Sequence, residues 1–243
     1  MTSGSTAAPR VAVLIPVFNE RESLPLVVAD IPRELVGEIV VVDNASTDDT
    51  PLVARGLPVR LVREERRGYG SACLAGIAAL EASPPEVLVF LDGDYSDHPE
   101  ELPRLMGAIA AGADLAIGSR MLGKREPGAL LPQAQIGNAL ACFLIRVLYG
   151  HRYTDLGPFR AIRWEALRTL GMEDRDFGWT VEMQVKAAKK GLSVVEVPVS
   201  YRRRVGVSKI TGTLSGTVAA GGKILWTIAR YRVGKSESGI GNR

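Results

Sequence analysis

Short apolar runs and longer amphipathic segments alternate along the first half of the chain. The apolar runs match strands in length, and the segments between them have the spacing of apolar residues that helices show. We expect strands at residues 11–15, 38–43, 59–62, 87–91 and 114–118, and helices at 22–31, 46–55, 69–81 and from Pro99 onward. Strands separated by helices indicate an α/β fold with a mostly parallel sheet of βαβ units and helices on both faces.

The second half of the chain has longer helical segments. The pattern predicts helices at 133–149, from Trp164, at 180–190 and at 211–231, and strands at 159–162 and 193–198. No linker of distinct composition and no repeat divides the sequence. We therefore expect one α/β domain at 10–210, with a disordered tail at 1–9 before it and an amphipathic C-terminal helix and tail at 211–243 after it.

Polar residues or glycines follow four consecutive predicted strands. Glu20 follows the first strand and Asp43 ends the second, while Gly68 and Gly70 follow the third and Asp92 follows the fourth. The carboxyl ends of parallel strands share one edge of the sheet, where open α/β sheets bind ligands. Four such ends in a row are more specific than any single motif, and they predict a ligand site at this edge.

The fourth strand end is the segment Val-Leu-Val-Phe-Leu-Asp92-Gly-Asp94. Five apolar residues predict a buried strand, and two carboxylates one residue apart follow it directly. Magnesium and similar hard cations are usually held by one or two carboxylates together with substrate phosphates. We expect Asp92 and Asp94 to hold Mg²⁺ or Mn²⁺, which in turn holds a diphosphate.

The remaining strand ends suggest contacts with a nucleotide. Asp43 is suited to accept a hydrogen bond from a base N–H or a ribose hydroxyl, and Glu20 to accept one from the ribose. Gly68 and Gly70 permit close backbone approach, and the N-terminus of the following helix favours an anion. For Ser46, a helix N-cap is favoured over a ligand contact.

Charge is distributed unevenly along the chain. The first 130 residues carry 12 Lys/Arg and 19 Asp/Glu, a balance of −7, whereas the remainder has a balance of +10. Eight basic and no acidic residues lie between Ser200 and Lys235. Such a segment either is a solvated face or binds an anionic partner, namely a lipid phosphate, a membrane surface or nucleic acid. Because aromatic residues are not interleaved with the basic ones, we expect no nucleic-acid partner.

Six motifs occur in order along the chain. They are Pro16-Val-Phe-Asn-Glu20, Asp43-Asn-Ala-Ser-Thr-Asp-Asp-Thr50, Asp92-Gly-Asp94, Gly118-Ser-Arg120, Asp155-Leu-Gly-Pro-Phe-Arg160 and Tyr201-Arg-Arg-Arg-Val-Gly-Val-Ser-Lys209. Over roughly residues 10–210 the chain resembles the family-two glycosyltransferases, specifically the dolichol-phosphate mannose synthase-like group of polyprenyl-phosphate glycosyltransferases. The resemblance implies a GT-A fold, a nucleotide-sugar donor, a divalent metal, and inversion at the anomeric carbon.

The resemblance also implies roles for individual residues. By this resemblance, Asp92 and Asp94 form the motif that binds the metal and the diphosphate, and Asp94 is part of the catalytic centre. The nucleotide-sugar is expected to lie against Pro16, Phe18, Glu20, Asp43 and Asp92, beside Gly68 and Gly70. Asp155 is placed near the reaction centre, as a base or as a group that orients the acceptor.

The chain departs from the group's pattern after the acidic pair. Where relatives often have Gln-His-Pro-Pro, this chain has Ser96-Asp97-His98-Pro99. Asp97 either compensates for the missing Gln as a metal ligand or caps the helix that begins near Pro99. UDP-glucose and GDP-mannose both stay open as donors.

The basic residues point to a phosphate acceptor. A phosphate monoester is already anionic near neutral pH, so it needs less help from a base than an alcohol does. Arginine suits bidentate phosphate recognition. We expect the phosphate of a polyprenyl phosphate, dolichyl or undecaprenyl, to be bound by Arg120, Arg202, Arg204, Ser208 and Lys209. Glu182 either contacts the acceptor or is a structural partner for an arginine.

Two alternatives stay open at this point. The acceptor could be a lipid or soluble alcohol in cell-envelope glycan synthesis, which would require Asp155 or Glu182 as an essential base. The chain could also be a nucleotide-sugar or lipid-binding module without turnover, although the intact acidic pair argues against this.

The expected location is the cytoplasmic face of a membrane. Cys73 and Cys142 belong to no disulfide or metal motif, which favours a reducing compartment, and no apolar run reaches about 18 residues, the length of a transmembrane helix. The helices at 133–149 and 211–231 each have an apolar face, and the second also carries Lys223, Arg230 and Arg232 nearby. We expect peripheral binding to an anionic membrane surface, or self-association into a homo-oligomer.

Overall fold

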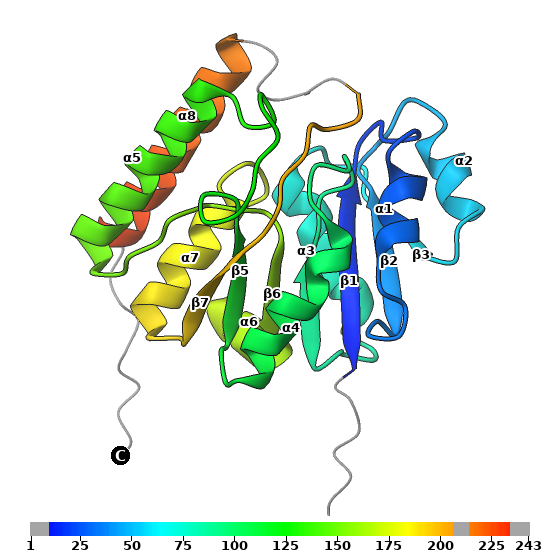
Figure 1. The fold of residues 1–243 in the computed structure, drawn as a ribbon, viewed down its shortest axis with the longest axis horizontal. Helices are drawn as coiled ribbons and strands as arrows, with labels where there is room; N and C mark the ends of the chain where they lie inside the picture. Colours follow the sequence, from blue (N-terminus) through cyan, green and yellow to red (C-terminus); the bar gives the residue numbers. More distant parts are fainter. Residues whose placement is uncertain (1–9, 207–213, 234–243) are drawn as a thin grey trace, which may run out of the picture.

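A seven-stranded sheet forms the centre of the computed structural model, which describes residues 10–206 and 214–233. The strand order is β3-β2-β1-β4-β6-β5-β7. The strands are β1 (Val11–Val17), β2 (Glu38–Asp43), β3 (Arg60–Arg63), β4 (Val87–Phe90), β5 (Leu115–Ser119), β6 (Arg160–Arg163) and β7 (Val194–Pro198) (Figure 1). The predicted strands therefore all exist, and their ends differ from the expected ones by at most two residues.

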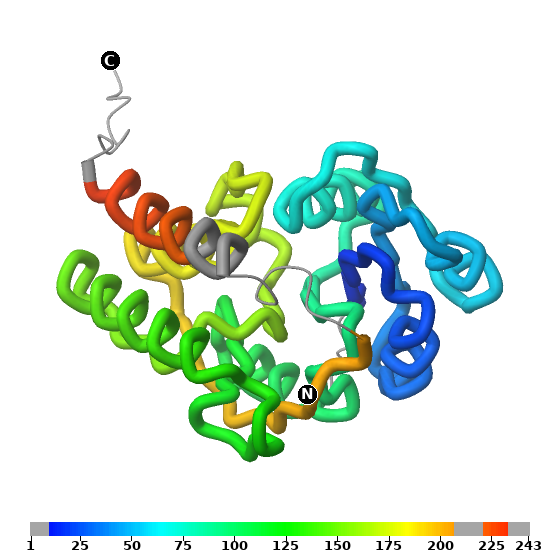
Figure 2. Tube along the Cα trace, turned by 90° about the horizontal axis from the view of Figure 1, so that it is seen from above, coloured from blue at the N-terminus to red at the C-terminus, as the bar shows by residue number. Residues whose placement is uncertain are grey.

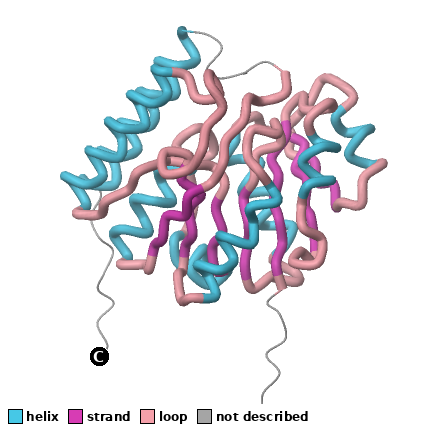
Figure 3. Tube along the Cα trace, viewed as in Figure 1, coloured by secondary structure: helices cyan, strands magenta, loops and turns pink. Residues whose placement is uncertain are grey.

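Helices cover both faces of the sheet (Figure 3). They are α1 (Leu24–Asp30), α2 (Thr50–Arg55), α3 (Tyr69–Leu80), the 3₁₀ turn η1 (Pro99–Glu101), α4 (Leu102–Ala110), α5 (Pro132–Tyr149), α6 (Trp164–Leu170), α7 (Trp179–Lys190) and α8 (Leu214–Val233). Side chains of β1 alternate between the two faces of the sheet. Ala12 and Leu14 belong to the apolar cluster that includes α3 and α5–α8, and Val13 and Ile15 belong to the cluster that includes α1, α2 and α4. The fold is thus the expected GT-A type, an α/β sheet with a helical layer on each side.

One strand runs against the others. β6 lies between β4 and β5 and pairs antiparallel to both, with Arg160 opposite Phe90 on one side and Ile117 on the other. The sheet is therefore mostly parallel, and the simple βαβ pattern does not extend through β6. Because β6 runs in reverse, its starting end lies beside the carboxyl ends of β4 and β5, which brings the loop before Arg160 to the ligand edge.

The segment before α2 differs from the expected helix cap. The helix begins at Thr50 rather than at Ser46, so the N-cap expectation for Ser46 is wrong. The Ser46 hydroxyl instead accepts a hydrogen bond from the Asn19 amide at 3.0 Å, and the Asp48 carboxylate accepts one from the Thr50 amide at 2.9 Å. The first of these bonds joins the loop after β1 to the loop after β2 at the ligand edge, and the second lies within the connection from β2 to α2.

α5 and α8 form an outer pair of helices, side by side in both views (Figures 1 and 2). α8 packs against α5 and α7 through the buried Ile228, and the Tyr149 hydroxyl donates a hydrogen bond to the Ile228 carbonyl. Its predicted start at Thr211 lies outside the described residues, as do Ser208 and Lys209. In the described part of the chain, no helix combines the length and apolar character needed to cross a bilayer.

Candidate active site

Two cavities meet at the carboxyl-terminal edge of the sheet. The first has a volume of about 320 Å³ and the second about 520 Å³. They share five lining residues, Tyr69, Asp92, Asp94, Phe177 and Arg204. The carboxylates of Asp92 and Asp94 therefore lie where the two cavities meet, and each cavity is large enough for one small ligand.

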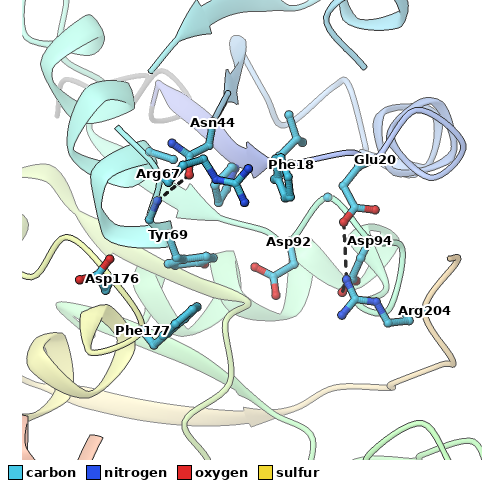
Figure 4. Close-up of a pocket in the computed structure, with 15 residues that line it drawn as sticks. Phe18, Glu20, Asn44, Arg67, Tyr69, Asp92, Asp94, Asp176, Phe177 and Arg204 are labelled. Carbon is cyan, nitrogen blue, oxygen red and sulfur yellow. Dashed lines mark hydrogen bonds and ion pairs between the residues drawn. The ribbon is translucent and has the colours of Figure 1, made fainter. Parts of the chain in front are cut away.

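The first cavity is built from the ends of β1, β2 and β4 and the start of α3 (Figure 4). Its lining residues are Pro16, Val17, Phe18, Glu20, Asn44, Arg67, Gly68, Tyr69, Ala72, Asp92, Gly93, Asp94, Asp176, Phe177 and Arg204. Pro16, Phe18, Glu20, Gly68 and Asp92, which the sequence predicts to contact a nucleotide-sugar, all line this one cavity.

Asp92 and Asp94 differ in how their carboxylates are satisfied. Asp94 Oδ2 lies 2.9 Å from the Arg204 guanidinium, and its Oδ1 accepts a hydrogen bond from the Ser96 amide at 2.9 Å. Asp92 Oδ1 is shielded from solvent and has no hydrogen-bond partner among the described residues. Burial, together with the charge of Asp94, raises the pKa of Asp92 to about 7. A buried carboxylate oxygen without a partner, next to a second carboxylate, fits a divalent cation bound to Asp92 and Asp94.

Asp97 is buried behind these two carboxylates. Neither of its oxygens has a hydrogen-bond partner in the described part of the structure, and it lines neither cavity. Burial, with the charges of Asp92 and Asp94, raises its pKa well above the ordinary value. The expected capping role is wrong because His98, not Asp97, precedes η1. Within residues 10–206 and 214–233, no three His, Cys, Asp or Glu side chains are arranged as a metal site, so Asp97 does not complete a set of three ligands.

The structure places Asp43 away from the cavity that it was expected to line. Its carboxylate is fully buried, forms an ion pair with Arg63 and accepts a hydrogen bond from the Ser46 amide at 3.2 Å. The neighbouring Asn44 lines the cavity instead. Asn44 donates to the Arg66 carbonyl at 2.7 Å and accepts from the Gly68 amide at 2.8 Å, so it fastens the loop that leads into α3.

Gly68, which precedes α3, and Gly70, in the first turn of α3, allow close packing within the protein. A side chain at Gly68, where φ is +138°, would collide with the Arg175 carbonyl, and one at Gly70 would collide with the Asp174 carbonyl. The Ser71 amide, in the first turn of α3, donates to the Arg175 carbonyl at 2.9 Å. The close approach expected of these glycines is therefore to the segment after α6, and Gly70 lines neither cavity.

An arginine–aromatic pair stands at the rim of the first cavity. The Arg67 guanidinium carbon lies 3.1 Å from the centre of the Phe18 ring, and both residues line the cavity. Figure 4 shows this pair beside Asn44, across the cavity from Arg204. The pair offers a flat surface together with hydrogen-bond donors, which suits the face and carbonyl edges of a nucleobase.

The second cavity combines cations with an apolar wall. Arg120, Arg203 and Arg204 line it, together with apolar residues that include Leu130, Leu131, Leu156, Pro158 and Ile224. The Arg120 side chain is only 12% exposed. Although burial opposes its charge, the Asp155 carboxylate raises the pKa of the Arg120 guanidinium above its ordinary value. The cavity can therefore hold an anionic head group beside an apolar chain.

Asp155 holds Arg120 and does not face either cavity. Its Oδ2 accepts hydrogen bonds at 2.8 Å from both the Arg120 amide and Nε, and its Oδ1 lies 2.7 Å from Nη2. The carboxylate is fully buried. This geometry fits the expected orienting role, whereas a base at this position would first have to release Arg120.

The three consecutive arginines after β7 point in different directions. Arg203 lines the second cavity and Arg204 lines both cavities, whereas Arg202 packs into the protein. The Arg202 guanidinium donates to the Tyr95 carbonyl at 2.7 Å and stacks 3.4 Å from the centre of the Tyr95 ring. The placement of Arg202 thus gives no support to its expected contact with an acceptor phosphate.

Comparison with known proteins agrees with this architecture. Residues 12–171 match the family model described as "Glycosyl transferase family 2". The chain belongs to glycosyl transferase family 2. This family 2 glycosyltransferase is 41% identical over 218 residues to an uncharacterized glycosyltransferase of Mycobacterium tuberculosis, a match that covers 88% of this chain and 95% of the relative.

Two further proteins are similar to this glycosyltransferase. The polyprenol monophosphomannose synthase of Mycolicibacterium smegmatis is 36% identical over 220 residues, which cover 84% of this chain and 82% of the relative. The glucosyl-3-phosphoglycerate synthase of M. tuberculosis, solved with Mn²⁺, UDP and glucosyl-3-phosphoglycerate, superimposes with a TM-score of 0.74 at 23% identity and covers 96% of this chain and 83% of that one. The second likeness is one of fold.

Glu182 lies away from both cavities of the glycosyltransferase. Its carboxylate is fully buried, forms an ion pair with Lys186 at 2.7 Å and accepts a hydrogen bond from the Tyr231 hydroxyl at 2.6 Å. It also accepts from the amides of Glu173 and Asp174. The partners of Glu182 are therefore a lysine, a tyrosine and two amides, rather than the expected arginine or acceptor.

Several residues of the site have no assigned role in the sequence prediction. Arg203 lies within the basic cluster, Asn44 lies within the motif at residues 43–50, and Tyr69 lies between Gly68 and Gly70. The sequence therefore marks these segments, but it does not show which way the three side chains point. Phe177 lines both cavities and comes from a segment between α6 and α7. No pattern in that segment separates Phe177 from an ordinary loop residue, and only the fold shows its position.

Proposed function

We propose that this glycosyltransferase transfers a hexose, with inversion, from a nucleotide-sugar to a polyprenyl phosphate at the inner face of a membrane. The observation that carries the proposal is the junction of the two cavities. A carboxylate-lined cavity suited to a nucleotide and a metal opens into one lined by three arginines and an apolar wall. Both reactants would then meet at Asp92, Asp94 and Arg204.

The first cavity is the proposed donor site. Asp92 and Asp94 would hold Mg²⁺ or Mn²⁺, and the cation supplies charge neutralisation of the departing diphosphate when bound. Phe18 and Arg67 would receive the base, and Glu20 would accept a hydrogen bond from the ribose. UDP-glucose and GDP-mannose are the donors to test.

The second cavity is the proposed acceptor site. Arg120, Arg203 and Arg204 would bind the phosphate, and Asp155 keeps the Arg120 fork in place. One phosphate oxygen attacks the anomeric carbon while the bond from that carbon to the donor diphosphate breaks. The acceptor is already anionic, so no side chain has to remove a proton from it. This agrees with the placement of Asp155 and Glu182, whose carboxylates bind other groups of the protein.

The outer helices supply the proposed membrane-facing surface. On α5, a stripe of four apolar side chains faces solvent, with exposed fractions of 70% at Ile136, 46% at Leu140, 59% at Phe143 and 62% at Val147. Their spacing places them on one side of the helix. On α8, Trp226 is 52% exposed and lies between Lys223 and Arg230. An exposed apolar stripe beside a tryptophan flanked by cations suits an anionic lipid interface.

The acceptor cavity reaches this surface. Its lining includes Leu130 and Leu131 before α5, Ala134 and Gly137 of α5, and Ile224 of α8. An acceptor with its phosphate at the arginines could therefore run its chain along the helices toward the bilayer. The similarity to a polyprenol monophosphomannose synthase supports the same class of acceptor.

A transfer assay with the purified protein tests this proposal. UDP-glucose and GDP-mannose are each supplied with Mg²⁺ or Mn²⁺, with either a short-chain polyprenyl phosphate or the matching polyprenol. We expect transfer to the phosphate, dependence on metal, and loss of transfer in Asp92→Asn. Transfer to the polyprenol but not to its phosphate would favour the alcohol-acceptor alternative and contradict the proposal. Donor binding without turnover would instead favour a binding module.

A further inference from the structure

The segment at residues 173–178, between α6 and α7, forms a wall shared by the two cavities. Phe177 is 38% exposed and lines both cavities, and Asp176 lines the first. Figure 4 shows both residues across the donor cavity from Phe18 and Glu20. A shift of this segment would therefore alter the two sites together.

On the donor side, this segment rests directly on the start of α3. The Arg175 carbonyl accepts hydrogen bonds from the Ser71 amide at 2.9 Å and from the Ser71 hydroxyl at 3.2 Å. The backbone at residues 174–175 lies against Gly68 and Gly70 so closely that a side chain at either glycine would collide with it. This side of the segment is thus fastened to the helix that also carries Tyr69.

On the other side, the segment is fastened through Glu182. Its carboxylate accepts hydrogen bonds from the Glu173 amide at 2.9 Å and from the Asp174 amide at 2.8 Å, and the Tyr231 hydroxyl of α8 donates to it at 2.6 Å. Lys186 completes the set at 2.7 Å. A fully buried carboxylate with this many partners is costly to displace, because loss of any of them leaves charge unsatisfied.

α8 makes a second contact with the same segment. Lys223 lies 3.1 Å from Asp174 Oδ2, while Asp174 Oδ1 accepts hydrogen bonds from the Asp176 amide at 2.8 Å and the Gly178 amide at 3.2 Å. Ile224, the next residue of α8, lines the acceptor cavity. The same helix therefore contacts the proposed acceptor site and holds the wall of the proposed donor site.

We infer that Glu182 and Tyr231 are positioning residues that let α8 set the place of Phe177 and Asp176 between donor and acceptor. The identity of the two ligands in this inference rests on the proposed function. The tie between α8 and residues 173–178, meaning the hydrogen bonds that Glu182 accepts from Tyr231 and from the amides of Glu173 and Asp174, does not. With the tie intact, residues 173–178 form a rigid wall of the donor cavity. Without it, donor binding weakens while the fold persists.

Two tyrosine variants separate this role from general support of α8. Tyr231→Phe removes the hydroxyl that binds Glu182, and Tyr149→Phe removes the hydroxyl that binds the Ile228 carbonyl of the same helix. Hydrogen exchange is measured for the amides of residues 173–178 in the ligand-free proteins. Binding of UDP and of GDP, each with Mn²⁺, is then measured by calorimetry, and melting temperatures are recorded.

We expect Tyr231→Phe to accelerate exchange at residues 173–178 and to weaken nucleotide binding by about tenfold, the usual scale for a hydrogen bond to a charged group. Tyr149→Phe should lower the melting temperature comparably and leave both other measurements unchanged. Equal effects of the two variants on exchange, or no effect of Tyr231→Phe, would overturn the inference. If the wild type binds neither nucleotide, the proposed function fails, and the exchange rates still decide whether the tie exists.

Discussion

At the scale of single residues, the candidate site depends on which way each side chain points. Asp92 and Asp94 stand where two cavities meet, whereas Asp97, three residues further along, is buried behind them. Arg203 faces a cavity and its neighbour Arg202 packs against Tyr95. The residue types at these positions indicate binding chemistry, and their orientation decides which of them can reach a ligand.

The raised pKa of Asp92 predicts that metal binding depends on pH. Below a pKa of about 7 the carboxyl of the metal-free protein is mostly protonated, and it must lose that proton before it binds a cation. The affinity should therefore fall as pH falls, by about tenfold per unit once the pH is below the pKa. We expect Mn²⁺ to raise the melting temperature more at pH 8 than at pH 6. In the control variant Asp92→Asn, the rise in melting temperature with Mn²⁺ should differ little between pH 8 and pH 6. An equal rise at the two pH values in the wild type would contradict the prediction.

The two neighbouring arginines make a second test at this scale. Arg203→Met should raise the KM for a polyprenyl phosphate by about tenfold, because it removes a cation from the second cavity, the proposed acceptor site. Arg202→Met should leave that KM unchanged and lower the melting temperature, because Arg202 binds the Tyr95 and Asp97 carbonyls. Initial-rate measurements on both variants give the two KM values. A raised KM in Arg202→Met with an unchanged KM in Arg203→Met would contradict the prediction and support the contact of Arg202 with the acceptor that the sequence predicts.

At the scale of elements, α3 shows how closely a helix must approach the sheet to form the site. A side chain at Gly76 would collide with Leu14 and crowd Val42, so the helix lies directly on β1 and β2. This close packing places the first turn of α3, with Tyr69, at the junction of the cavities.

Two glycine substitutions test this packing. Gly76→Ala should destabilise the protein by about 1–3 kcal/mol, because the added methyl group overpacks a filled core. Gly107→Ala, also within a helix, meets nothing within 4 Å and should stabilise by about 0.5–1 kcal/mol. Chemical denaturation of both variants gives the two free energies of unfolding. Similar values for the pair would show that α3 does not require the close approach.

At the scale of the whole molecule, the outer helices lie on the sheet face that carries α3, at the end of the sheet with β5 and β7 (Figures 1 and 2). The exposed stripe of α5 and the second cavity adjoin each other at the start of that helix. α8 packs through Ile228 and Tyr231 and keeps Trp226 exposed, so only part of its predicted apolar face is available to a membrane.

A vesicle assay tests which surface faces the membrane. Phe143→Asp places a charge within the α5 stripe and should reduce flotation with anionic vesicles several-fold. Leu52→Asp, at an equally exposed site on α2, should leave flotation unchanged, since α2 lies at the opposite end of the sheet. Equal flotation of the two variants and the wild type would contradict this surface, and a change in oligomeric state of Phe143→Asp would favour self-association.

By itself the sequence determined the helices and strands, the mostly parallel sheet and the strand ends that build the first cavity. These features depend on local periodicity and on the shared edge of parallel strands, both of which can be read along the chain. Tertiary structure alone decided the reversal of β6, the burial of Asp43, Asp155 and Glu182 in ion pairs, and the arrival of Phe177 between the cavities. Most of these contacts join residues far apart in the sequence or on different elements, so they cannot be read along the chain. A carboxylate that forms an ion pair with an arginine or lysine of the protein is not available to a ligand.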